Sequence, residues 1–211
     1  MNGISEKTAL LNVMKQFVIM WLLTGVGMFI GSMLPPIVAT FMSILAIGAL
    51  ILTWFVKKTK VVKKIMFIVP FLMGFAFYFS VNMYASKLGS GAVMGALVLT
   101  IAMFLILGFV GYVAIKRDLG GLGQVLMFAL LALIILSIVS IFFHSAILHM
   151  IIAFGGLVIF SLYTLYDFNQ MKQNGIPPGS ETYYALNLYL DFLNLFLKVL
   201  QVFDILSSDD D

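Results

Sequence analysis

Long apolar runs follow one another along almost the whole chain, and this feature constrains the fold more than any other. A helix needs about 20 mainly apolar residues to cross a hydrocarbon core of about 30 Å. We predict seven spanning helices, at about 13–34, 37–56, 63–84, 92–115, 122–143, 145–170 and 183–206. The short links between them contain Gly and Pro residues typical of turns. The sequence therefore predicts an all-α membrane protein in which residues 1–211 form a single transmembrane domain.

The composition agrees with a membrane protein and excludes several classes of partner. Only 10% of the residues are charged, against about 25% in soluble domains. The net charge of +3 comes from basic residues in the links between apolar runs, so we expect no nucleic-acid partner. Cysteine is absent from the sequence, which excludes disulfides and thiolate-bound metals. The expected surroundings are the lipid bilayer and small ions, and the sequence identifies no protein partner.

Lysine and arginine are distributed unequally between the two sides of the predicted membrane domain. One side carries Lys7, Lys15, Lys57, Lys58, Lys60, Lys63, Lys64, Lys116, Arg117 and Lys172, whereas the links on the other side carry only Lys87. Basic residues are enriched in cytoplasmic links. We therefore predict a multi-pass protein of the plasma (inner) membrane with a cytoplasmic N-terminus and an external C-terminus.

A stripe of polar residues follows one face of the last predicted helix. Its members are separated by four, three, four and three residues, and they are Asn187, Asp191, Asn194, Lys198 and Gln201. Side chains at this spacing share one face of a helix, and that face cannot contact lipid without leaving polar groups unsatisfied. One interpretation is hydrogen bonding between helices. The aspartate and lysine favour the other, a water-accessible pore lined by this helix.

Two aspartates stand in otherwise apolar motifs. Asp167 lies in SLYTLYDFNQ (161–170), and Asp191 lies in NLYLDFLNLF (187–196), about 13 Å down the last helix. For the two to meet, the sixth helix must continue past Asp167 toward Lys172. The alternative for Asp167 is a solvated carboxylate at a helix end.

A close pair of these carboxylates has restricted chemistry. Both cannot ionise cheaply in a poorly hydrated site, so they share a proton, and its loss creates a repulsion that helix movement or a cation must relieve. Aspartate and asparagine oxygens are ligands that suit Ca²⁺. Asp167 and Asp191 are thus predicted to form a pH sensor and a tentative Ca²⁺ site, with no other cofactor required. Protonation favours the closed pair, and deprotonation loosens it.

The two aspartate motifs, the YAS stretch at 84–86 and the ILSSDD ending resemble the Bax inhibitor-1 family, also called the transmembrane Bax inhibitor motif family. The resemblance extends to its small bacterial calcium-leak members. It implies a seven-helix fold whose last helix is central and wrapped by the other six. It also implies a pH-sensitive Ca²⁺ leak governed by an aspartate pair, at Asp167 and Asp191 here. Similar bacterial proteins place an arginine latch at the end of helix two, where this chain has Lys57 as candidate counter-charge, and some carry a carboxylate where Ala46 stands.

The function predicted from the sequence is a pH-sensitive Ca²⁺ leak channel and not an enzyme. A proton-coupled cation exchanger is the alternative, because it would use the same carboxylates as carriers. An intramembrane aspartyl protease fits less well. Tyr166 and Asp167 match the first half of its motif, but Leu188, Tyr189 and Leu190 precede Asp191 where the protease has a G-x-G pattern.

Overall fold

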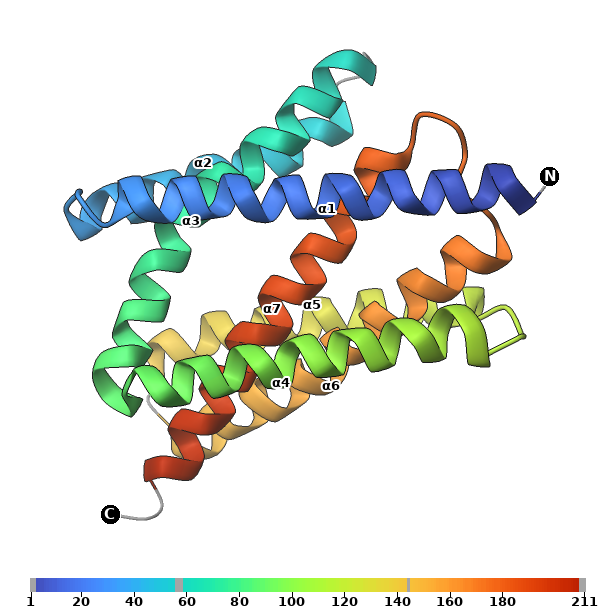
Figure 1. Ribbon diagram of the computed structural model, residues 1–211. Coiled ribbons are helices and arrows are strands. Elements are labelled where there is room, and N and C mark those ends of the chain that lie inside the picture. The colour runs from blue at the N-terminus through green and yellow to red at the C-terminus, as the bar shows by residue number, and fades with distance from the viewer. Residues whose placement is uncertain (1–2, 56–58, 144, 209–211) are drawn as a thin grey trace. The chain divides into compact units, whose positions relative to one another are not determined.

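The computed structural model describes residues 3–55, 59–143 and 145–208, and these residues form helices and short links without a strand. The seven α-helices are α1 (Gly3–Gly31), α2 (Pro36–Phe55), α3 (Thr59–Leu88), α4 (Ser90–Phe109), α5 (Gly120–Phe142), α6 (Ala146–Gln173) and α7 (Glu181–Ser208) (Figure 1). The predicted all-α class and helix count are confirmed. Helix α1 begins well before its apolar run, because polar residues can extend a helix beyond the bilayer.

Most of the helices have the length and apolarity of membrane spans. Five of them, α1, α3, α4 with the turn that follows it, α5 and α6, supply apolar segments of 23 to 28 residues, and about 20 suffice to cross a bilayer. The described apolar part of α2 is shorter, Pro36–Leu52. Helix α7 is not among these five. The chain is a multi-pass membrane protein.

The chain divides into two compact units, Met1–Met83 with Ile176–Tyr189 and Tyr84–Gly175 with Leu190–Asp211. The single transmembrane domain and the central position of α7 stay predictions. In the first unit α1 crosses α3 at glycines. A Cβ atom on Gly27 would run into the backbone carbonyl oxygen of Phe71, and one on Gly74 would lie 2.8 Å from the Cα atom of Gly27. Small residues of this kind allow two helix backbones to approach closely in a membrane.

A buried hydroxyl network in the first unit connects this crossing to the start of α7. The Thr24 hydroxyl lies 3.0 Å from the Met20 carbonyl oxygen and 3.1 Å from that of Pro70, and its distance to the Tyr189 hydroxyl is 2.8 Å. Because the single Thr24 proton is donated to a carbonyl, Tyr189 donates to Thr24. The Tyr189 ring also packs against Trp21, with ring centroids 5.2 Å apart. Tyr189 is thereby anchored to α1, and Thr24 connects it to the Pro70 carbonyl of α3.

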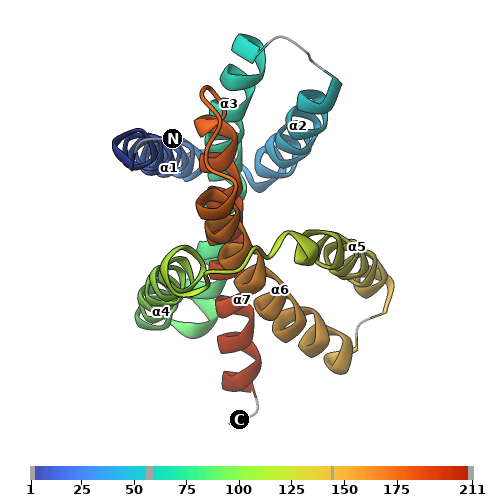
Figure 2. The same ribbon diagram turned by 90° about the vertical axis from the view of Figure 1, so that its right-hand side faces the viewer.

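In the second unit α6 packs against both α4 and α5 (Figure 2). Its apolar core contains Leu133, Ile152, Phe160 and Leu195. The C-terminal part of α7 joins the same unit, since the Phe104 ring of α4 contacts Phe168 of α6 and Phe192 of α7, with ring centroids 5.5 and 5.3 Å apart. The two motifs that contain Asp167 and Asp191 therefore meet on one aromatic ring.

Candidate functional site

Asn169, two residues after Asp167, organises the link between α4 and α5. Helix α4 ends in a wide turn of π-helix, Val110–Ala114, which leaves several backbone groups without a helical partner. The fully buried Asn169 side chain supplies hydrogen-bond partners for these backbone groups. Its Oδ1 accepts a hydrogen bond of 2.9 Å from the Leu119 backbone N–H, and its Nδ2 lies within 3.3 Å of the carbonyl oxygens of Gly111, Ile115 and Arg117.

The aromatic neighbours of Asp167 fit against glycines on adjacent helices. A Cβ atom on Gly108 of α4 would lie 3.0 Å from the Phe168 ring, and one on Gly123 of α5 would meet the Tyr166 hydroxyl. Helix α6 continues past Asp167 to Gln173, as pairing with a deeper aspartate requires. Contacts on both sides of Asp167 therefore hold its segment of α6 in place.

An exposed carboxylate in the link is held by the end of α6. Asp118 Oδ1 accepts hydrogen bonds of 2.8 Å from both the Gln170 Nε2 and the Gly120 backbone N–H. These two bonds hold the pKa of Asp118 below its ordinary value. The stabilisation is present above the ordinary pKa of aspartate and is lost as the pH falls through the lowered one.

The two motif aspartates lie in the second unit, and Asp191 is the more deeply buried. Asp191 is 6% exposed, and its Oδ2 atom has no hydrogen-bond partner among the residues that the structure describes. Asp167 is close enough for its charge to act on Asp191. Tyr163 lies one helical turn before Asp167, and the charges of Asp167 and Asp191 both act on its hydroxyl group. The influence of the Asp167 charge on Asp191 agrees with the predicted pair, which stays a prediction.

The other predicted stripe residues have separate local partners. Asn194 Nδ2 donates to the Leu190 carbonyl oxygen one turn earlier, at 2.8 Å. Lys198 is 9% exposed, and its Nζ donates to Gln201 Oε1 at 2.9 Å. Asn187 is half-buried on the first-unit part of α7. Lys57, the candidate counter-charge, lies outside the described residues.

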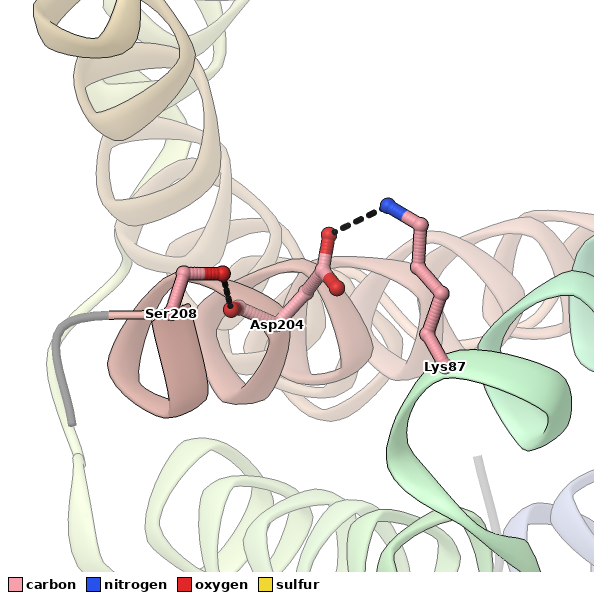
Figure 3. Close-up of polar contacts among 3 residues, drawn as sticks. All are labelled: Lys87, Asp204 and Ser208. Atoms are coloured by element: carbon pink, nitrogen blue, oxygen red, sulfur yellow. Dashed lines mark hydrogen bonds and ion pairs between the residues drawn. The ribbon is translucent and has the colours of Figure 1, made fainter. Parts of the chain in front are cut away.

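The polar stripe on α7 continues beyond the five residues that were predicted to form it. Asp204 and Ser208 follow Gln201 after three and four more residues, and this continued spacing was the signal that could have identified them. Asp204 Oδ2 accepts from Lys87 Nζ at 3.1 Å, and Ser208 Oγ donates to the Asp204 carbonyl oxygen at 2.8 Å (Figure 3). The buried Tyr84 hydroxyl is hydrogen-bonded to Gln201 and lies near Asp204. The stripe therefore reaches the exposed end of α7.

Removal of the Lys87–Asp204 ion pair is expected to have little effect on stability. Because the two side chains are 54% and 27% exposed, Lys87→Gln should lower the free energy of unfolding by less than about 1 kcal/mol. Unfolding with sodium dodecyl sulfate in mixed micelles provides the measurement. Lys116→Gln removes a lysine that has no described ion pair and serves as the control. A loss above about 2 kcal/mol relative to that control would contradict the assignment of a weak exposed pair.

The described residues contain no group of three or more His, Cys, Asp or Glu side chains that could hold a metal ion. The predicted Ca²⁺ site at Asp167 and Asp191 therefore stays a prediction. Asn169 is not a free ligand, because its Oδ1 and Nδ2 atoms both bind the α4–α5 link.

Comparison with known proteins gave consistent matches. The sequence model of a family described as inhibitor of apoptosis-promoting Bax1 matches residues 6–208. An uncharacterized protein of Helicobacter pylori strain J99 is 34% identical over 131 residues, which are 61% of this chain and 55% of that protein. Inner membrane protein YbhL of Escherichia coli K12 is 32% identical over 123 residues, 54% of this chain and 52% of that protein.

An uncharacterized membrane protein of Streptococcus pyogenes serotype M3 is 31% identical over 153 residues, 70% of this chain and 65% of that protein. The matched part of the chain spans about half the length of the curated relatives from H. pylori and E. coli. The similarity to these three proteins is thus partial, whereas the family match covers nearly the whole chain.

Proposed function

The chain belongs to the Bax inhibitor family of membrane proteins, and from this premise we propose that it is a pH-sensitive Ca²⁺ leak channel of the plasma (inner) membrane. Its N-terminus is cytoplasmic and its C-terminus is external. The proposed location is supported by the similarity to a protein of E. coli that is named an inner membrane protein. The proposed sensor is the Asp167–Asp191 pair, and the polar stripe of α7 lines the path.

The observation that carries the proposal is the buried Asp191 carboxylate with its unbonded Oδ2 atom. A buried carboxylate oxygen without a donor is costly, and a proton or a cation removes that cost. The charge of Asp167 acts on the same group. A proton shared by the pair and a cation held between the two carboxylates are therefore alternative ways to satisfy one site.

The oxygen ligands favour Ca²⁺ as the permeant cation. Ca²⁺ takes about six to eight oxygen ligands and accepts irregular geometry. Asp167 and Asp191 supply at most four carboxylate oxygens, so backbone carbonyls, the Asn194 amide oxygen or water complete the shell. Because two carboxylates bind Ca²⁺ weakly, the ion can leave as well as enter, as conduction requires.

The direction of gating follows from charge repulsion. At low pH the shared proton holds α6 and α7 together at the pair. As the pH rises, both carboxylates become charged, and their repulsion loosens the contact and admits Ca²⁺. Lys57 is the candidate counter-charge that would stabilise a deprotonated but closed form, as a point charge without the bidentate geometry of arginine.

Ca²⁺ flux into liposomes containing the purified protein tests the proposal. Wild-type flux is expected to rise with pH, by up to about tenfold per pH unit for one titrating proton. Asp191→Asn and Asp167→Asn should each remove most of this dependence, because a neutral amide cannot lose the shared proton. Asp118→Asn changes an exposed acid in a link and is the matched control, with the wild-type profile expected. An unchanged pH profile in both pair variants would refute the gate.

A proton-coupled cation exchanger is the second candidate, since a buried acid such as Asp191 is also typical of proton carriers. An ionophore that clamps the proton gradient separates the two. Flux through a leak continues under the clamp, whereas an exchanger stops. We propose no enzymatic activity. The residues before Asp191 carry large side chains, and Leu188 and Tyr189 are fully buried, so a substrate backbone has no open approach from that side.

A further inference from the structure

Lys198 is a buried cation in the same stripe as the aspartate pair. Its side chain lies against Gly156 of α6, where a Cβ atom would be 2.6 Å from Lys198 Cε and 2.8 Å from Cδ. The Lys198 side chain therefore occupies space that a side chain at position 156 would fill. The residue is 9% exposed, so Lys198 is not a surface lysine.

The charge of Lys198 has no carboxylate partner among the described residues. Its hydrogen bond goes to the neutral amide oxygen of Gln201, and the ion pair found in that part of the chain joins Lys87 to Asp204 instead. A buried ammonium without an opposite charge is expensive. A neutral residue would fill the same space at lower cost, so packing alone does not explain a lysine at this position.

The position of Lys198 along α7 relates it to ion movement. Lys198 follows Asp191 by seven residues, which corresponds to two helical turns and about 10 Å along the axis. The Lys87–Asp204 pair beyond it is locally neutral. A cation that leaves the aspartate pair along the stripe toward the exposed end of α7 therefore passes one buried positive charge.

We propose that Lys198 is a specificity-determining residue, an electrostatic barrier that limits the flux of divalent cations along α7. The inference rests on the proposed channel function and adds a residue that sets rate and ion preference. Repulsion between the ammonium and an ion scales with the charge of the ion. The barrier therefore acts more strongly on Ca²⁺ than on a monovalent cation such as K⁺.

Flux of Ca²⁺ and K⁺ into liposomes, measured at one fixed pH, tests the barrier. Lys198→Met keeps the length of the side chain without its charge, and we expect Ca²⁺ flux to rise at least about tenfold. The ratio of Ca²⁺ flux to K⁺ flux should rise with it. Lys198→Arg retains the positive charge and should keep Ca²⁺ flux low. An equal rise for both ions would indicate a widened path and would overturn the barrier.

A pair of neighbouring glycines gives a second test that leaves Lys198 in the chain. Gly156→Ala forces the flexible end of the lysine side chain to move, and we expect a higher ratio of Ca²⁺ flux to K⁺ flux. Gly155→Ala is the matched control, because a Cβ atom there meets nothing within 4 Å, and its ratio should equal that of the wild type. This pair decides the question if Lys198→Met fails to fold, as judged by size-exclusion chromatography in detergent.

The outcomes separate this inference from the proposed function. Wild-type protein that conducts Ca²⁺, together with unchanged flux ratios in Lys198→Met and Gly156→Ala, would overturn the barrier and leave the leak in place. Wild-type protein that conducts no Ca²⁺ at any pH would overturn both. A pH profile that persists in Lys198→Met is expected, because the barrier and the aspartate sensor are different groups.

Discussion

Asn169→Leu is expected to lower the free energy of unfolding by about 3 kcal/mol or more, and the variant should be recovered poorly from membranes. The leucine fills a similar volume but leaves the buried Leu119 N–H without an acceptor and removes the donor shared by three carbonyl oxygens. Each buried group left unsatisfied costs about 1–3 kcal/mol. The measurement is unfolding with sodium dodecyl sulfate in mixed micelles.

Asn174→Ala is the matched control for this change. Asn174 is exposed at the end of α6, and its Nδ2 donates a single side-chain hydrogen bond, to Gln170 Oε1. We expect a loss of less than about 1 kcal/mol, as for other exposed hydrogen bonds. Equal stabilities of the two variants would show that Asn169 does not hold the α4–α5 link.

Gly27→Ala and Gly25→Ala, two residues apart on α1, are expected to have effects of opposite sign. At Gly27 the new methyl group meets the Phe71 carbonyl oxygen and must push α1 away from α3, which should cost about 2 kcal/mol or more. At Gly25 a Cβ atom meets nothing within 4 Å. Alanine also favours the helix there by up to about 1 kcal/mol.

Thermal unfolding monitored by size-exclusion chromatography in detergent can rank the two variants against the wild type. The expected order of midpoints is Gly25→Ala at or above the wild type, with Gly27→Ala clearly below both. Reversal of that order, or a Gly27→Ala protein as stable as the wild type, would be incompatible with the close crossing of α1 and α3.

The helices could be predicted from the sequence because the length and apolarity of a run are local properties. The run predicted at 122–143 corresponds to α5, Gly120–Phe142. The run predicted at 183–206 corresponds to α7, Glu181–Ser208. Helix α1 was predicted to begin at about residue 13 and begins at Gly3, since the prediction followed apolar residues alone. Hydropathy marks where a helix enters lipid, and the helix itself can extend further.

Contacts between helices could not be predicted in the same way. Gly27 and Gly31 are four residues apart on α1, and both face α3, but spacing alone does not tell which helix a glycine meets. The π-helical turn at Val110–Ala114 depends on Asn169, a side chain far along the chain. The residue type of Asn169 does not tell whether its amide binds an ion or the backbone, and the structure shows it bonded to backbone groups.

In the candidate site, too, local sequence patterns could be predicted and contacts between helices could not. The motifs around Asp167 and Asp191 and the periodic stripe on α7 are sequence patterns, and they predicted which residues carry charge into the apolar region. The buried packing of Lys198 against Gly156 and the hydrogen bond between Tyr84 and Gln201 involve different helices. The three-residue spacing from Gln201 to Asp204 continues the stripe toward the end of the helix.

Asn169 follows Leu119 by 50 residues, and this separation has a consequence for biosynthesis. When α4 and α5 leave the ribosome, the side chain that completes their connection has not yet been made. Until α6 arrives, the open backbone groups of the connection can be satisfied only by water at the headgroup layer. The hairpin of α4 and α5 is therefore finished by a later helix, and a nascent chain arrested before residue 169 should retain a hydrated, protease-accessible link.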